Sequence, residues 1–377
     1  MLRPIDGGAR MLKTIAWTLL LVLLALAAYL LLWPVPVRAV HWTAPPAPGY
    51  AGAHAVNQRL AGLQVIALGA EEGPEHVAFG PDGRLYAAMA SGKILRMAAD
   101  GSGQQVFAST GGRVLGFAFD ANGQMIAADA VKGLLAIAPD GKVRVLADKL
   151  GADPIRYADA VAVARSGLVF FSDASTRFGP ADWGGTFEAS VLDIIEQSAT
   201  GRILVYDPAN GTTAIVARGL SFANGVALSA DERWIFVAET GRYRIWKIAA
   251  DARDLDLAAG PSPQARVLLD NLPGYPDNLM PGMEGRIWVG LTKPRSPVVD
   301  GMANKPWLRE MTLRLPRALW PVPPAYGHVF AFTEDGQVVA DLQDPSGAYP
   351  ETTAVTETAE RLYVQSLHAK GLGWKAK

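Results

Sequence analysis

The sequence contains no cysteine, which excludes disulfide bonds, thiolate nucleophiles and thiolate-bound zinc or iron–sulfur centres. Its five histidines are scattered, so we expect no His-rich metal site. The net charge of −1 gives no electrostatic basis for binding nucleic acid. What the chain does have is length and apolar content. Its 377 residues, half of them hydrophobic, can bury a large core.

The N-terminal region predicts a membrane anchor. Residues 14–33 form an uncharged apolar run that is long enough to cross about 30 Å of hydrocarbon. Basic residues precede this run and aromatic residues lie near its ends, as at a membrane interface: Arg3, Arg10, Lys13, Trp17, Tyr29 and Trp33. The positive-inside rule then predicts a short cytoplasmic N-terminus (1–13) and places the rest of the chain in the periplasm or outside the cell.

A cleaved signal peptide is the alternative interpretation of this run. The run is longer than a usual signal core, and residues 34–38 make a poor small-residue cleavage site, so the anchor is favoured. Residues 34–59, rich in Pro and Ala, then predict an extended linker that leads away from the membrane.

One sequence unit recurs through the rest of the chain, residues 60–377. Its clearest copy, residues 272–291, has a polar strand start, a turn and then an alternating strand. Six copies place one residue eight positions before the turn: Glu75, Leu115, Asp159, Asn224, Asp277 and Thr352. About four strands belong to each unit, so we predict an all-β fold, a six-bladed β-propeller. An isolated strand over 63–68 precedes the first copy and is expected to close the ring.

Two insertions interrupt the period, at 175–200 and 292–325. Each contains apolar residues at helical spacing, over 187–197 and 307–319, and each falls between the second and third strands of its blade. Such loops rise over the mouth where the innermost strands begin. They are interpreted either as padding of the blades or as a lid over an apolar pocket. The second, basic and Trp-rich, is alternatively a membrane-surface contact.

The shared offset predicts a site on the axis. Innermost strands that start at the channel mouth bring Glu75, Asp159, Asn224 and Asp277 together, and Asn278 adds a further oxygen. Three carboxylates in a narrow channel repel each other without a cation. A set of oxygen ligands without sulfur suits Ca²⁺ better than Mg²⁺. The ion could be catalytic, or a structural ion or water cluster could fill the channel instead.

The chain resembles the strictosidine synthase-like family of six-bladed propellers, within a wider group that includes the gluconolactonases, regucalcins and paraoxonases. The resemblance covers roughly residues 63–374 and rests on motifs such as GPEHVAFGPDGRLYAAM, GRILVYDPANG, FANGVALS and GYPDNL. In the calcium-dependent lactonases of this group, a Glu, two Asn and an Asp bind the catalytic calcium. The resemblance therefore implies Glu75, Asn224 and Asp277 as ligands, with Asn278 matching the paraoxonase-type Asp-Asn pair. Asp159 stands where an Asn is usual.

The resemblance also implies roles in catalysis. The Asp of the lactonase set is proposed as the base, which selects Asp277, with Glu75 beside it. The plant enzyme that gives the family its name condenses an amine with an aldehyde through a Glu of the last blade. That position falls at about Thr353 here, and Glu351 lies two residues away.

Other candidates are interpreted mainly as structural residues. His76 follows Glu75 on a strand and points to the opposite face. His328 and His368 are the candidates for a proton shuttle of the paraoxonase kind. No G-x-S-x-G elbow surrounds Ser172 or Ser175, which argues against a serine hydrolase.

These observations predict a membrane-anchored, Ca²⁺-dependent hydrolase that acts on a lactone or ester of a partly apolar small molecule. Two alternatives remain open. One is a carbon–nitrogen lyase or condensing enzyme of the strictosidine synthase type, which works without metal. The other is a binding or scaffold propeller with a structural ion.

Overall fold

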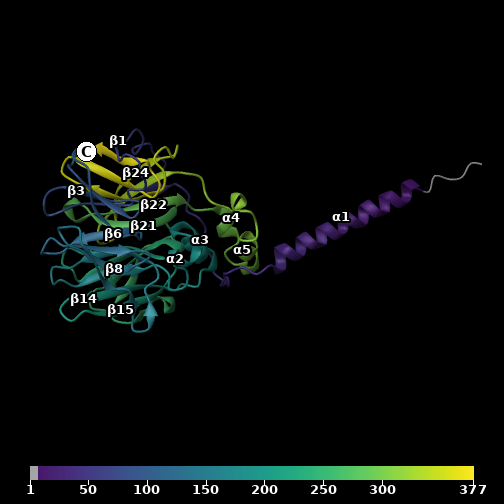
Figure 1. Ribbon diagram of the computed structural model, residues 1–377, viewed down its shortest axis with the longest axis horizontal. Coiled ribbons are helices and arrows are strands. Elements are labelled where there is room, and N and C mark those ends of the chain that lie inside the picture. The colour runs from purple at the N-terminus through teal and green to yellow at the C-terminus, as the bar shows by residue number, and fades with distance from the viewer. Residues whose placement is uncertain (1–6) are drawn as a thin grey trace, which may run out of the picture.

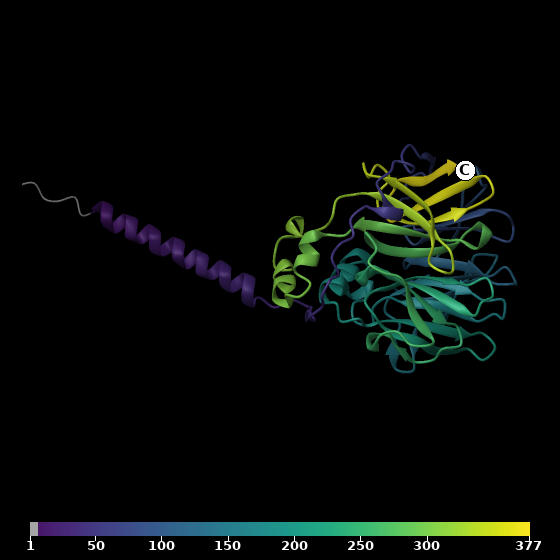
Figure 2. The same ribbon diagram turned by 180° about the vertical axis from the view of Figure 1, so that it is seen from behind.

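The computed structural model describes residues 7–377 and shows six antiparallel sheets around a common axis (Figures 1 and 2). The innermost strands β2, β6, β12, β16, β21 and β25 follow one another around a ring. Within the first five blades the strands then run outward in chain order, whereas the outermost strand of the sixth blade is β1. The predicted six-bladed propeller with an apolar N-terminal helix and helical insertions is confirmed.

The first three blades take up the N-terminal half of the ring. The first contains β2 (His76–Phe79), β3 (Leu85–Ala88), β4 (Lys93–Met97) and β5 (Gln105–Ser109). The second contains β6 (Val114–Phe119), β7 (Met125–Asp129), β8 (Gly133–Ile137) and β9 (Val143–Ala147), followed by a small hairpin, β10 (Lys149–Leu150) and β11 (Asp153–Pro154). The third contains β12 (Ala158–Val163), β13 (Val169–Asp173), β14 (Gly201–Asp207), β15 (Thr212–Leu220) and the short β19 (Leu255–Asp256).

The last three blades complete the ring. The fourth contains β16 (Ala223–Leu228), β17 (Trp234–Glu239), β18 (Arg244–Ala249) and β20 (Ala265–Leu269), with the short 3-10 helices η2 (Thr240–Arg242) and η3 (Leu257–Ala259) in its connections. The fifth contains β21 (Gly274–Pro281), η4 (Met283–Gly285), β22 (Ile287–Pro294), β23 (Gly327–Phe332) and β24 (Val338–Asp344). The sixth contains β25 (Thr352–Glu357), β26 (Arg361–Ser366), β27 (Gly371–Ala376) and β1 (Gln64–Ala67).

The strand expected to close the ring does so. β1 pairs antiparallel with β27, with Gln64 opposite Trp374 and Ala67 opposite Gly371. The sixth blade therefore combines strands from both ends of the propeller, which removes an exposed sheet edge. Between blades, apolar side chains from facing sheets form the core. Trp246, for example, is buried with Ile203 and Val237 between the third and fourth blades.

Both insertions lie where the sequence predicts them. The first carries α2 (Pro180–Trp183) and α3 (Thr186–Glu196) between β13 and β14. The second carries α4 (Pro297–Gly301), α5 (Pro306–Thr312) and η5 (Arg317–Leu319) between β22 and β23. The helix expected over 307–319 is shorter than predicted. Pro316 disfavours helical geometry at the residue before it, so the helix ends and a separate short turn follows.

The apolar N-terminal run forms the long helix α1 (Gly7–Leu32), which projects away from the propeller (Figures 1 and 2). Its segment Arg10–Leu32 is long and apolar enough to cross a membrane, and none of it is buried in the protein. The helix begins before the predicted 14–33 because Ala9, Arg10, Met11, Leu12 and Lys13, all good helix formers, precede the apolar run. Residues 1–6 of the expected cytoplasmic N-terminus, including Arg3, lie outside the described residues.

The segment between helix and propeller, residues 34–59, is extended as predicted but follows the protein surface, and we call it the strap. Near its start, the backbone amide of Val40 donates to the carbonyl oxygen of Glu196 at 2.8 Å. Val37 is buried against the first insertion. Near its end, after η1 (Gly52–His54), the Asn57 amide donates to Asp341 of β24 at 2.9 Å. The strap is therefore fastened at both ends rather than free.

Candidate active site at the mouth of the central channel

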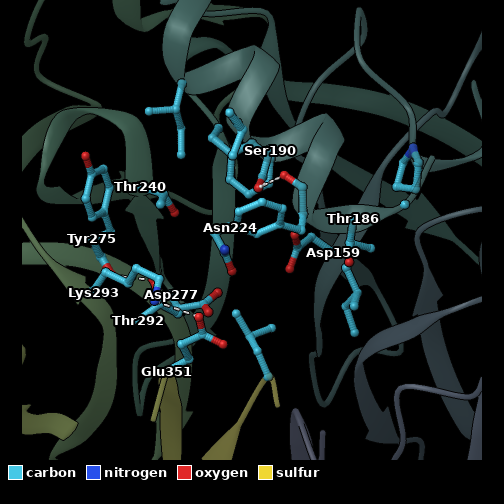
Figure 3. Close-up of a pocket in the computed structure, with 18 of the residues that line it drawn as sticks. Asp159, Thr186, Ser190, Asn224, Thr240, Tyr275, Asp277, Thr292, Lys293 and Glu351 are labelled. Atoms are coloured by element: carbon cyan, nitrogen blue, oxygen red, sulfur yellow. Dashed lines mark hydrogen bonds and ion pairs between the residues drawn. The ribbon is translucent and has the colours of Figure 1, made fainter. Parts of the chain in front are cut away.

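The starts of four innermost strands supply polar side chains to one cavity of about 530 Å³. Glu75 directly precedes β2, Asp159 lies in β12, Asn224 in β16 and Asp277 in β21, and all four line the cavity. Each is at most 5% exposed. Figure 3 shows Asp159, Asn224 and Asp277 pointing into this cavity from three different blades. The structure thus brings together four residues that are far apart in the sequence.

A local irregularity recurs where these strands begin. The pairing of the innermost with the second strand shifts register just after Ala158, after Ala223 and around Pro276. Such bulges re-aim a side chain that a regular strand would turn into the neighbouring sheet. Gly225 allows the next blade to come close, since a Cβ there would lie 2.4 Å from the carbonyl oxygen of Asp277. Asn224 and Asp277 are therefore positioned by backbone packing between blades.

The three carboxylates are electrostatically unfavourable neighbours. Burial raises the pKa of Asp159 well above its usual value, and the charges of Asp277 and Glu75 raise it further. Burial and the charge of Glu75 likewise raise the pKa of Asp277, although the Asn224 amide opposes this rise. The pKa of Glu75 is raised by burial and lowered in part by Arg113. The pocket therefore favours either protonation of these groups or a bound cation.

Arg113 is a site residue that the sequence analysis did not identify. Its guanidinium forms an ion pair with Glu75, and it lines the cavity. In the second blade the expected position holds the apolar Leu115, and the arginine stands two residues earlier, just before β6. Three carboxylates and one guanidinium leave a formal charge of −2 at the mouth. One divalent cation would neutralise this charge.

Several buried oxygens of the candidate residues lack a partner. Asp159 Oδ1, Asn224 Oδ1 and Asn278 Oδ1 are buried without a hydrogen bond in the part of the chain that the structure describes. Buried polar atoms are rarely left unpaired in proteins. These oxygens are the ligands that Ca²⁺ prefers, so the residues fit such an ion. The ligand oxygens of the three carboxylates nevertheless do not all lie within 4.8 Å of one another. Among residues 7–377, the ligand atoms of His54, His328 and Asp341 do reach this spacing, away from the cavity.

Asn278 has a different place from the other candidates. It is buried but does not line the cavity, and its amide donates to the backbone carbonyl of Glu75 at 3.2 Å. The Thr353 hydroxyl donates to the same carbonyl at 2.8 Å. Both side chains therefore fix the backbone that carries Glu75, and Thr353 offers no acid at the position of the plant enzyme's Glu.

A second polar group lies on the cavity wall in the sixth blade. Glu351 contacts Lys293 at 2.7 Å and accepts a hydrogen bond from His368. These contacts lower the pKa of Glu351 to about 2 despite its burial, and Glu351 raises the pKa of His368. Figure 3 shows Lys293 and Glu351 together beside Asp277. With His368 protonated, this group of three residues carries a formal charge of +1 beside the carboxylates.

The other candidates lie away from the cavity. His76 is buried with its ring against Phe117, at a centroid distance of 4.6 Å. His328 Nε2 lies 2.8 Å from Asp341, on the outer part of the fifth blade. Ser172 and Ser175 accept hydrogen bonds from backbone amides: Ser172 Oγ from Ala160 at 2.9 Å and Ser175 Oγ from Phe178 at 3.0 Å. Of the three histidines considered, only His368 lines the cavity.

The insertions provide an apolar upper wall. Phe187, Val191 and Ile194 of α3 line the cavity from one side. Leu313, Trp320 and Val322 of the second insertion line it from the other. A site with a charged floor and apolar walls is typical of pockets that orient a small molecule through a few polar groups.

Comparison with known proteins identifies the family. Residues 52–97 match the strictosidine synthase-like N-terminal family, and residues 159–252 match the strictosidine synthase family. The strictosidine synthase-like protein 6 of Arabidopsis thaliana is 31% identical over 310 residues, which cover 80% of this chain and 76% of that protein. The chain belongs to the strictosidine synthase-like family.

Other members of the strictosidine synthase-like family match in part. Strictosidine synthase-like protein 13 of Arabidopsis thaliana is 32% identical over 221 residues, 57% of this chain and 51% of that protein, so the match spans about half of its length. Among solved structures, a gluconolactonase from Xanthomonas campestris has a TM-score of 0.59 at 18% identity, covering 91% and 99% of the two chains. The calcium-binding protein regucalcin from Agrobacterium tumefaciens has a TM-score of 0.55 at 17% identity, covering 83% and 93%. These two likenesses establish a common fold.

Proposed function

We propose that this chain is a membrane-anchored, calcium-dependent hydrolase of a lactone or ester, with α1 as the anchor and the propeller in the periplasm or outside the cell. The observation that carries the proposal is the convergence of Glu75, Asp159 and Asp277 on one largely apolar cavity. Buried carboxylates with raised pKa values in a cleft are a common mark of a functional site.

The donor set supports calcium as the ion. The mouth has a formal charge of −2 with Arg113 included, and oxygens of Asp159 and Asn224 there lack partners. A gluconolactonase and a calcium-binding regucalcin share the fold, which is consistent with this chemistry. Glu75, Asp159, Asn224 and Asp277 would hold the ion, and Asn278 would act by positioning Glu75.

In this mechanism the chain orients the substrate and moves a proton. A calcium ion held by Glu75, Asp159, Asn224 and Asp277 would supply a Lewis acid for the substrate carbonyl. Asp277 accepts the proton of the attacking water, since its carboxylate faces the cavity. The apolar side chains of the two insertions bind the body of the substrate and limit access of bulk water.

A second candidate function rests on Glu351. It lies two residues from the position of the plant enzyme's glutamate and lines the cavity, so a condensing or lyase reaction without metal has an acid available. However, Lys293 and His368 hold this group as an anion, which makes it a poor proton donor. A binding propeller with a structural ion is the third possibility and predicts no turnover.

The deciding experiment is a hydrolysis assay of the full chain in detergent, with a panel of lactones and aryl esters. We expect turnover that chelator abolishes and added Ca²⁺ restores. Turnover that survives chelation would overturn the metal mechanism and support the Glu351 reaction. Calcium binding without turnover of any compound would support the structural ion.

A further inference from the structure

The last turn of α1 is bound to the second insertion. Arg314, which is 9% exposed, donates from Nε to the carbonyl oxygen of Trp33 at 2.6 Å and from Nη1 to that of Leu30 at 3.2 Å. The last carbonyls of a helix have no partner within the helix, and a cation is favourable beside them. The end of the apolar helix is therefore held against the insertion by side-chain contacts.

The same insertion forms one wall of the channel mouth. Leu313, directly before Arg314, lines the cavity, and so do Trp320 and Val322. Figures 1 and 2 show the C-terminal end of α1 beside α4 and α5, on the side where these helices stand out from the propeller. One segment thus contacts both the candidate membrane span and the cavity.

The insertion also exposes large apolar side chains. Val298, Trp307 and Leu319 are 56%, 57% and 63% exposed. Basic groups accompany them, since Lys305 is exposed and the Arg317 side chain is 62% exposed. Tryptophan and leucine next to lysine and arginine are typical of segments that lie in the headgroup region of a membrane. A bilayer around α1 would lie next to these side chains.

We propose that the second insertion rests in the headgroup layer of the membrane that α1 spans, so that the channel mouth opens at the bilayer surface. The occupant of this apolar surface is lipid. The helix that would cross the bilayer ends against Arg314, in the same insertion that carries the exposed apolar side chains.

This placement also specifies the substrate class, in a step that rests on the proposed function. A molecule that enters from the bilayer surface passes between the apolar walls of α3 and the second insertion before it reaches the carboxylates. The expected substrate is therefore an amphiphile that partitions into lipid, with its carbonyl group at one end and a hydrocarbon chain along the wall. A cavity of about 530 Å³ is large enough for a drug-sized molecule.

The absence of cysteine makes the membrane contact directly measurable. Leu319→Cys and, as the matched control, Asn122→Cys can each be labelled with an environment-sensitive fluorophore without background reaction. Asn122 is exposed in the turn between β6 and β7, at the end of the innermost strand opposite the channel mouth. The full chain is then reconstituted into vesicles of phosphatidylcholine with a minor fraction of phosphatidylglycerol, with or without nitroxide-labelled lipid.

We expect nitroxide lipid to reduce the fluorescence at 319 by about twofold or more and to leave 122 nearly unchanged, because only the first label would touch lipid. Val298→Cys repeats the test at an independent position. Equal, water-like behaviour at 298, 319 and 122 would overturn the proposal. A blue-shifted but unquenched label at 319 would also overturn it, because a second copy of the chain would then cover the surface.

A second experiment tests the substrate class. Leu319→Asp should lower hydrolysis of a long-chain lactone presented in vesicles by at least about fivefold and change hydrolysis of a water-soluble short-chain lactone by less than about twofold. Asn122→Asp should change neither rate. Equal effects on both lactones would overturn the entry route. Failure of the wild type to hydrolyse either lactone would overturn the proposed function and this substrate class, while the fluorescence result would still decide the membrane contact.

Discussion

The Thr353 hydroxyl donates a hydrogen bond of 2.8 Å to the backbone carbonyl of Glu75, and so joins the sixth blade to the first at the channel mouth. Asn278 of the fifth blade donates to the same carbonyl. The backbone that carries Glu75 is therefore held in place by two blades other than its own. A site built in this way depends on the closed ring.

Thr353→Ala should weaken calcium binding about three- to tenfold, because a buried hydrogen bond contributes roughly 1 kcal/mol to fixing Glu75. Titration calorimetry on the full chain in detergent measures the affinity. Thr353→Ser keeps the hydroxyl and should restore most of it. Equal affinities for all three proteins would show that this hydrogen bond does not position the ligand.

Calcium should raise the melting temperature of the wild type, since an ion that binds only the folded state stabilises it by roughly 2.7 kcal/mol at a hundred times its dissociation constant. Glu75→Gln and Asn224→Ala should reduce that shift, whereas Asp251→Asn on the surface should not. Differential scanning fluorimetry with chelator and with calcium gives the comparison. If neither chelator nor calcium changes the melting temperature of the wild type, the result would argue against the calcium site.

Arg113→Gln should destabilise the calcium-free protein and enlarge the stabilisation that calcium provides. In the absence of metal, Arg113 neutralises part of the negative charge at the mouth through its ion pair with Glu75. The same ion pair competes with calcium for the Glu75 carboxylate. The melting temperatures of wild type and variant, each with chelator and with saturating calcium, test both parts. A smaller calcium shift in the variant would mean that the arginine supports the ion instead.

Asp277→Asn should remain folded at saturating calcium and lose at least about 100-fold of the hydrolysis rate, because an amide keeps an oxygen donor but cannot act as a base. His368→Gln is the informative comparison, since His368 also lines the cavity. Steady-state rates with the same lactone separate the two. A larger loss in His368→Gln would assign the proton transfer to the histidine.

Asp193 of α3 predicts a pH dependence of stability. Burial raises the pKa of Asp193 to about 7, and the nearby Glu196 and Glu239 add to the rise. The folded state thus favours the protonated form, so stability falls as the pH rises from the ordinary pKa of 3.8 to about 7 and changes little above it. Each pKa unit corresponds to about 1.4 kcal/mol.

Asp193→Asn should therefore raise the melting temperature at pH 8 and have little effect at pH 4. Asp251→Asn, on the surface, is the matched control and should show no such trend. Melting curves of the full chain across this pH range provide the measurement. An equal shift at both pH values would trace the effect to packing rather than to ionisation.

The repeat made most of the fold accessible from the sequence. A turn eight residues after a strand start recurs often enough to define six blades, and the spare strand before the first blade predicts the closure through β1. The same eight-residue spacing predicted the site, because residues at equivalent positions of the innermost strands lie at the same end of the central channel. Glu75, Asp159, Asn224 and Asp277 line one cavity for that reason.

What the sequence could not show depends on contacts between distant segments. Arg113 lies outside the repeat position, and only the packing of the second blade against the first brings it to Glu75. The strap looks like a free linker in composition, yet Glu196 and Asp341 supply its partners from distant parts of the chain. The local sequence does not indicate which of His328 and His368 lines the cavity, because each lies in a strand or loop of similar composition.

The pairing of β1 with β27 also constrains the order of folding. These two strands are separated by almost the whole described chain, so their contact has a very high sequence separation and carries a large loop-closure cost. The five intervening blades can form earlier, from local hairpins. Until β27 pairs, the sixth blade has an open edge that could pair with another chain. Completion of the ring is thus expected to be the slow step of folding. The protein is expected to be most prone to aggregation before this step, while the edge is still open.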